Sequence, residues 1–382
     1  MLTYSFLQHY WWFIISLLGG ILSFLLFVQG GQSMLFTLPK TEDQRRLVVN
    51  VLGRKWEYTF TTLVTFGGAF FASFPLFYST SFGGAYWVWM AILFCFILQA
   101  VSYEFQSKPG NTYGKTTYRV FLYINGVVGT VLIGAAVATF FTGSDFLINK
   151  GNITNQLAPV ISRWGNEWHG LDALFNLRNW LLGLAVLFLS RTNAALFFVN
   201  RISDVELENN ARKAVLFNAL PFLVFFLSFV IWTMMADGFA VNPDTKQVFM
   251  EPNKYLMNLI EMPVVLILFL AGVVAVLWGI GGTVINANFK KGIWFSGAGT
   301  IVTVCSLLLL AGYNNTAYYP ATPDLQSSLT IFNSSSSEFT LNAMAVASLI
   351  IPVVATYIFF AWRALEKKRT DIEDINNDSH AY

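Results

Sequence analysis

Residues 214–236 read AVLFNALPFLVFFLSFVIWTMMA, an apolar run without a charge, with Arg212 and Lys213 before it and Asp237 after it. About 20 apolar residues let a helix cross a bilayer core of about 30 Å. The 382-residue chain repeats this arrangement, and only 12% of its residues are charged. A soluble domain has about twice that charged fraction. The composition indicates an all-α polytopic membrane protein and excludes a soluble nucleic-acid binder.

Nine segments are long and apolar enough to span a membrane, and they predict one integral membrane domain over residues 1–382. Their approximate bounds are 10–37, 58–80, 84–104, 118–142, 179–200, 213–236, 260–286, 292–312 and 339–362. A short Gly/Ser turn separates the second from the third, so these two are expected to form a tight antiparallel pair. The longer connections are expected to be loops with short interfacial helices; they are 143–178, 237–259 and 313–338.

The basic residues predict the orientation of the chain. With nine spans, one side of the membrane receives 17 of the 23 lysines and arginines, and the other side receives five. Cytoplasmic connections carry an excess of basic residues. We therefore expect an external N-terminus and a solvated cytoplasmic tail over residues 363–382.

Histidine is scarce and badly placed for a metal site in the membrane. His9 lies at the outer end of the first span, His169 in an external loop and His380 near the C-terminus. A haem in a membrane protein is usually held by histidine or methionine at depth, and no H-x-x-x-H or C-x-x-C spacing occurs. The sequence therefore predicts neither a metal ligand nor a catalytic residue in this chain.

Two carboxylates stand at the predicted cytoplasmic ends of neighbouring spans. Glu57 opens the second span directly after Arg54 and Lys55, and Glu104 closes the third. One interpretation pairs them with nearby basic residues at the interface. The other is a proton entry point, because carboxylates with adjustable pKa values suit proton uptake.

The remaining ionisable residues in or beside spans are weaker candidates. Arg191 lies within the fifth span and is expected to form a structural ion pair, since a charge at depth is costly. Asp237 and Glu261 lie near the external face, where Asp237-Gly238 also fits a helix end.

Three small-residue clusters, 67–73, 279–282 and 296–299, predict close helix packing. A glycine-lined gap that admits a small apolar molecule is the alternative. The Ser-rich segment 327–344 either caps the start of the last span or acts as a flexible linker.

Four stretches, 45–78, 103–108, 236–239 and 327–344, occur in an order and spacing that resemble subunit II of cytochrome bd-type quinol oxidases. The positions that carry the resemblance most clearly are Arg45, Arg46, Asn50, Trp56, Gly67, Gly68, Pro75, Ser328, Thr330 and Thr340.

The chain also departs from this family pattern. Where the family usually shows Asp-Gly-Phe-Asp near the end of the first span, it has Gln29-Gly30-Gly31-Gln32. Where an Arg-Pro pair is usual, it has Gln99-Ala100. Two carboxylates and one arginine are thus replaced by neutral residues, which indicates a divergent branch and leaves Glu57 and Glu104 as the surviving acidic pair.

The resemblance implies a bacterial inner-membrane complex that oxidises quinol and reduces O2 to water, generating membrane potential. Haems b558, b595 and d would be carried by subunit I, and this haem-free chain would pack against it and give protons or O2 access. A bound structural quinone and a small accessory subunit are further implied candidates. A secondary transporter and a purely scaffolding subunit are the alternative readings.

Overall fold

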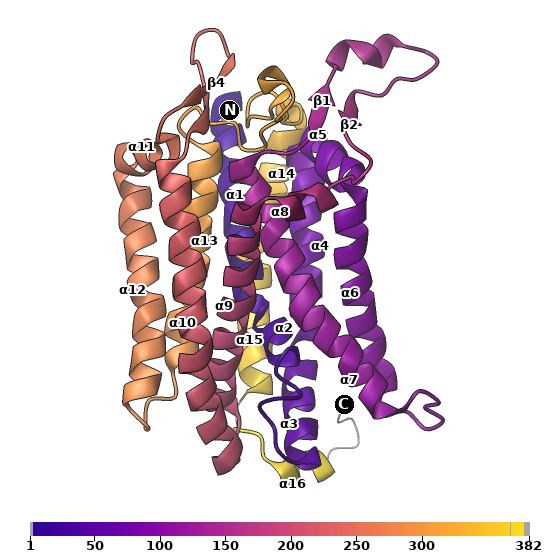
Figure 1. Ribbon diagram of the computed structural model, residues 1–382, viewed down its shortest axis with the longest axis vertical. Coiled ribbons are helices and arrows are strands. Elements are labelled where there is room, and N and C mark those ends of the chain that lie inside the picture. Colours follow the sequence, from indigo (N-terminus) through magenta and orange to yellow (C-terminus); the bar gives the residue numbers. More distant parts are fainter. Residues whose placement is uncertain (1–2, 367, 378–382) are drawn as a thin grey trace.

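The computed structural model describes residues 3–366 and 368–377 as a bundle of long helices lying side by side (Figure 1). Within this part, eight helices are long and apolar enough to cross a membrane, and a bent pair raises the number to nine. The prediction of about nine spans is therefore confirmed. The unbent spans are Tyr4–Gln32, Tyr86–Phe105, Gly114–Thr142, Leu177–Arg201, Val205–Met235, Pro263–Ile285, Gly292–Gly312 and Glu338–Ala364.

Several spans contain more than one helical segment. The first contains α1 (Tyr4–Leu25) and α2 (Phe27–Gln32), and the last contains α14 (Glu338–Ser348) and α15 (Ile351–Leu365). The fourth contains α7 (Gly114–Ile124), the π-helical turn η2 (Asn125–Gly129) and α8 (Thr130–Thr142). The single-helix spans are α6 (Tyr86–Phe105), α9 (Leu177–Arg201), α10 (Val205–Met235), α12 (Pro263–Ile285) and α13 (Gly292–Gly312).

The second span is broken at Pro75. The helices α3 (Glu42–Gly53) and α4 (Trp56–Ser73) precede the break, and α5 (Pro75–Phe77) and the π-helical η1 (Tyr78–Gly84) follow it at an angle of 117°. Proline disfavours helical backbone at the residue before it, and Phe74 leaves the helix with φ −132°. The element η1 contacts both α4 and α6, which contact each other little. The expected tight pairing of the second and third spans is therefore wrong.

The longer connections form an ordered layer over the end of the bundle that holds the start of α1 (Figure 1). Strand β1 (Phe146–Ile148) pairs with β2 (Ser162–Trp164), and β3 (Gly238–Val241) pairs with β4 (Val248–Glu251), both antiparallel. Isolated bridges link Ser144 to Ala321 and Ala240 to Thr316. Helix α11 (Lys254–Glu261) and short 3-10 turns complete the layer; they are η3 (Lys150–Thr154), η4 (Leu171–Phe175) and η5 (Leu325–Ser327). Short helices were expected here, but the strands were not.

The Ser-rich segment is part of this layer. Ser328, Thr330 and Ser334 are buried, and the Ser334 hydroxyl lies 2.8 Å from that of Tyr318. Ser337 caps α14 by accepting from the backbone N–H of Thr340 at 3.2 Å. The capping interpretation is confirmed, and the flexible linker is wrong because the segment is fixed by buried hydrogen bonds.

Small residues bring helices together at two of the three predicted clusters. A Cβ atom on Gly279 would lie 2.5 Å from the carbonyl oxygen of Gly292, and one on Gly299 would lie 2.5 Å from that of Gly272. Gly68 differs, because no atom lies within 4 Å of the place its Cβ would take. Clusters 279–282 and 296–299 pack closely as predicted, whereas the cluster that begins at Gly67 does not.

At the opposite end of the bundle the tail folds back onto the helices. Glu366 pairs with Lys55 at 3.3 Å, and the Lys55 ammonium lies 4.0 Å from the Trp362 ring. Arg369 pairs with Glu208 at 2.6 Å. Ile375, in α16 (Ile372–Asn377), is buried. The prediction of a solvated tail is therefore wrong for this part of 363–382, because ion pairs and burial hold it.

Candidate functional site

A buried polar feature of the bundle is a cluster of four amide side chains, Gln29 and Gln32 on α2, Gln99 on α6 and Asn125 at the start of η2. All four are completely buried. The Gln99 Oε1 atom accepts from Gln29 Nε2, Gln32 Nε2 and Asn125 Nδ2, each at 2.7 Å. Asn125 Nδ2 also donates to Gln32 Oε1 at 2.9 Å. One oxygen therefore ties three segments of the chain together.

Close backbone packing around α2 positions this amide cluster. All six residues of α2 are buried. A Cβ atom on Gly30 would lie 2.0 Å from the Ser190 carbonyl oxygen of α9, and one on Gly126 of η2 would lie 2.5 Å from that of Gln29. Only glycine allows helices to approach so closely. The π-helical turn that begins at Asn125 is a feature often found at functional sites.

The three positions that depart from the family pattern lie in contact. Gln29 and Gln32 stand where the family usually has two carboxylates, and both donate hydrogen bonds to Gln99, which stands where the family usually has an arginine. Exchange of a charged group for a neutral one at a single buried position leaves its partners uncompensated, so the three replacements make sense only together. The amide cluster can fix helices by hydrogen bonding, but amides do not titrate.

The amide cluster is connected to the region of the two candidate carboxylates. Gln32 Nε2 donates to the Tyr103 hydroxyl at 3.1 Å, and the Tyr103 ring stacks on Trp56 with 6.0 Å between centroids. Glu57 and Glu104 are the residues directly after Trp56 and Tyr103. Both are exposed on this chain, and neither has an ion pair or hydrogen bond with another residue of the described ranges. The stack thus joins the ends of α4 and α6 that carry the two carboxylates.

The other buried-charge candidates do not join this site. Arg191 has no ion-pair partner among the described residues, so the structural ion pair expected there is not found; its guanidinium lies 5.8 Å from the Phe188 ring. Asp237 is exposed just beyond the end of α10. Glu261 is exposed and accepts from Asn314 Nδ2 at 2.5 Å.

The family-like positions serve mainly the framework. Arg45 donates to the Leu35 carbonyl at 3.2 Å, and Arg46 lies 4.0 Å from Asp43 within α3. Asn50 is buried, with no hydrogen-bond partner for its side-chain amide among the described residues.

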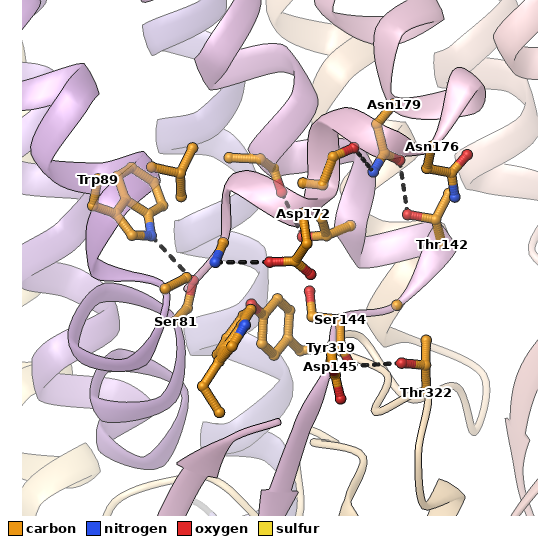
Figure 2. Close-up of a pocket in the computed structure, with 18 residues that line it drawn as sticks. Ser81, Trp89, Thr142, Ser144, Asp145, Asp172, Asn176, Asn179, Tyr319 and Thr322 are labelled. Carbon is orange, nitrogen blue, oxygen red and sulfur yellow. Dashed lines mark hydrogen bonds between the residues drawn. The ribbon is translucent and has the colours of Figure 1, made fainter. Parts of the chain in front are cut away.

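A second polar site, absent from the sequence-based predictions, lies beneath the loop layer. Figure 2 shows Asp172 and Tyr319 facing a cavity of about 140 Å³ that Ser144 and Asp145 also line. Asp172 accepts from the Gly170 backbone N–H at 2.9 Å, and burial raises the pKa of Tyr319 to about 12. The lining residues of this loop-layer cavity come from segments far apart in the sequence, so no local sequence motif predicts it.

Two further cavities are apolar. A hollow of about 480 Å³ between α4 and α6 is walled by aromatic side chains and by Gly67 and Gly68. A smaller cavity of about 60 Å³ lies among α1, α8, α9, α10 and α13, with Phe141 and Leu182 in its wall. The alternative weighed for the glycine-rich stretch 67–73, a gap that admits a small apolar molecule, therefore fits the first hollow.

The helical bundle and its buried, uncharged amide cluster define a polytopic helical membrane protein in which buried amide side chains join neighbouring helices. The family model for cytochrome bd terminal oxidase subunit II matches residues 7–365, and the chain belongs to this family. It is 25% identical over 398 residues, all of both chains, to cytochrome bd-I ubiquinol oxidase subunit 2 of Escherichia coli K12. It is also 25% identical over 396 residues, again all of both chains, to a probable cytochrome oxidase subunit 2 of Haemophilus influenzae.

A solved structure shares the fold. A chain of the bd oxidase from Geobacillus thermodenitrificans superposes with a TM-score of 0.60 at 16% identity, covering 94% of this chain and 98% of that one. Membership of the family makes this chain a multi-pass inner-membrane subunit of a haem-containing quinol oxidase complex, with subunit I as its partner. The resemblance in the sequence is confirmed, and the transporter reading is not favoured.

Proposed function

We propose that this chain is the haem-free subunit of its complex, and that subunit I carries haems b558, b595 and d and performs quinol oxidation and O2 reduction. The observation that supports this proposal is that both described histidines already form hydrogen bonds to backbone carbonyl groups. His9 Nδ1 donates to the Ser5 carbonyl at 2.7 Å, and His169 Nδ1 to the Gly84 carbonyl at 2.9 Å. Neither lines the amide cluster or the cavities above, so these residues do not fit a haem. His380 lies outside the described residues.

We further propose that protons for O2 reduction enter from the cytoplasmic side, at the end of the bundle that carries α3 and α16. The uneven distribution of basic residues supports this orientation. Since the amide cluster contains no titratable group, ionisation at the inner end of the path rests on Glu57 and Glu104. Both are exposed on this chain, so the proposed path is completed when subunit I covers them.

Replacing both carboxylates, as Glu57→Gln with Glu104→Gln, is expected to slow quinol-driven O2 consumption about ten-fold, equivalent to about 1.4 kcal/mol in the activation barrier. Glutamine keeps the shape but removes titration. The measurement is O2 uptake by the purified complex, together with its haem spectrum, which is expected to stay unchanged. Glu373→Gln, an exposed carboxylate of the tail at the same end, is the control. Normal turnover in the double variant would exclude a proton path through these two carboxylates, and scaffolding would then be the only role left for this chain.

The hollow between α4 and α6 is the place we propose for a structural quinone. It is walled by aromatic rings, among them Phe82 and Trp89, which stack with 4.1 Å between centroids. Its volume of about 480 Å³ lies within the usual range of small-molecule sites. The cavity of about 60 Å³ is too small for a quinone ring.

Gly68→Leu is expected to fill this hollow and to lower the quinone content of the purified complex at least about five-fold, since the new side chain occupies apolar space that the ligand needs. The thermal midpoint is expected to stay the same, because a Cβ atom on Gly68 meets no atom within 4 Å. Quinone extraction and chromatography provide the measurement. Quinone retained at the wild-type level would show that the ligand binds elsewhere.

The last span offers a surface for a partner. Only 6% of its most apolar window is buried within this chain, and Val353 and Tyr357 of α15 are exposed. We propose that subunit I, or a small accessory subunit, covers this face.

A further inference from the structure

A basic pocket opens between the segment 34–40 that follows α2, helix α9 and helix α10, and it has no part in the function proposed above. It has a volume of about 480 Å³ and contains Lys40, Arg191 and Lys213 in its wall, without any acidic residue. None of these three cations has an ion-pair partner within residues 3–366 and 368–377. A guanidinium within a membrane span is stable only when a counter-charge or polar groups compensate it. The three cations therefore make this pocket suited to bind an anion.

The position of this basic pocket shows which anion it suits. A helix needs about 20 residues to cross the hydrocarbon core, so a core that ends at Met235 of α10 begins near Val215. Lys213 then lies at the polar boundary, and Phe217, one turn further on, lies within the hydrocarbon region and is 76% exposed. Arg191 lies ten residues, or about 15 Å along α9, before Arg201, and its long side chain can reach towards the boundary.

The walls of the basic pocket combine charge with apolar surface. Phe188, Phe217 and Leu38 line it beside the three cations. Asn210 adds a buried side-chain N–H group that has no hydrogen-bond partner in the described ranges. A soluble anion would use the cations but leave the apolar wall uncovered. A phospholipid uses both, because its phosphate meets the cations while its acyl chains cover the phenylalanines.

We propose that this basic pocket binds the phosphodiester headgroup of an anionic phospholipid. Arg191 and Lys213 hold the phosphate, Lys40 adds charge from the loop after α2, and the acyl chains run along the exposed face of α10. Gly30 and Ser190 make the backbone contact between α2 and α9 beside Arg191. The lipid would therefore stabilise the contact between these two helices, which also positions the amide cluster.

The test uses the whole complex, extracted, delipidated and returned to nanodiscs of phosphatidylcholine alone or of phosphatidylcholine with phosphatidylglycerol. Wild type is expected to retain phosphatidylglycerol on re-extraction, measured by mass spectrometry, and to gain thermal stability from it. The variant Arg191→Gln with Lys213→Gln is expected to bind it at least about ten-fold more weakly, since two charge-assisted contacts are lost. Lys115→Gln, an exposed lysine at the start of α7, is expected to behave like wild type.

A second variant keeps the test decisive if Arg191→Gln prevents folding. Lys40→Gln with Lys213→Gln alters only exposed positions. It is expected to weaken the retention of phosphatidylglycerol at least about three-fold, since one phosphate contact and the added charge of Lys40 are lost. Equal retention of phosphatidylcholine, or unchanged phosphatidylglycerol retention in the variants, would overturn the proposal. So would stabilisation by inorganic phosphate equal to that by the lipid, which would assign the pocket to a soluble anion.

Discussion

Gly30→Val is expected to prevent stable assembly of the bundle. A Cβ atom at this position would lie 2.0 Å from the Ser190 carbonyl oxygen and 2.5 Å from the Arg191 nitrogen. Both atoms belong to the backbone of α9, which cannot rotate away as a side chain can. Overpacking a well-packed core costs about 1–3 kcal/mol and occasionally more, and a backbone clash at a completely buried helix belongs at the upper end. We expect a loss of about 3 kcal/mol or more.

The measurement is the amount of chain in the membrane and the thermal midpoint of the purified complex. Gly68→Val is the matched control, because a Cβ atom at this position of α4 meets no atom within 4 Å and helix propensity favours valine slightly over glycine. If the two variants were equally stable, the close approach of α2 to α9 would not support the bundle.

The sequence predicts the spans well and their contacts poorly. Hydropathy depends on local composition, so a run such as 214–236 is recognised without any knowledge of its neighbours. The break at Pro75 changes the pairing of α4 and α6 although both are correctly placed as spans. A hydropathy profile cannot show this, because it averages over a window of residues and does not record the direction in which the chain leaves the helix at Phe74.

The candidate site was predicted in parts. Gln29, Gln32 and Gln99 stood out as departures from a family pattern, but only the fold shows that one oxygen of Gln99 joins them. Asn125 carried no signal beyond the glycines that follow it. The loop-layer cavity was not predicted at all, because Asp145, Asp172 and Tyr319 come together through contacts between loops that no sequence spacing describes.

The joint exchange of three charged residues for three neutral ones has an energetic reason. In the family pattern the arginine at position 99 would have two carboxylates for partners. In this chain the same place is completely buried and surrounded by amides. Breaking a buried charge pair by removing one partner costs about 3–5 kcal/mol, so single exchanges in either direction are strongly disfavoured.

Gln99→Arg alone is therefore expected to destabilise the complex by about 3–5 kcal/mol and to lower the yield of haem-containing complex sharply. Adding Gln29→Asp and Gln32→Asp is expected to recover most of this loss, since two carboxylates then face the guanidinium and each aspartate, one methylene shorter than glutamine, makes room for it. The thermal midpoints of the single, double and triple variants give the coupling between the positions.

The double aspartate variant should also be unstable by itself, because it buries two like charges without a cation. A triple variant no more stable than Gln99→Arg would mean that the charges at the three positions are not energetically coupled, and Gln29, Gln32 and Gln99 would then be three independent substitutions.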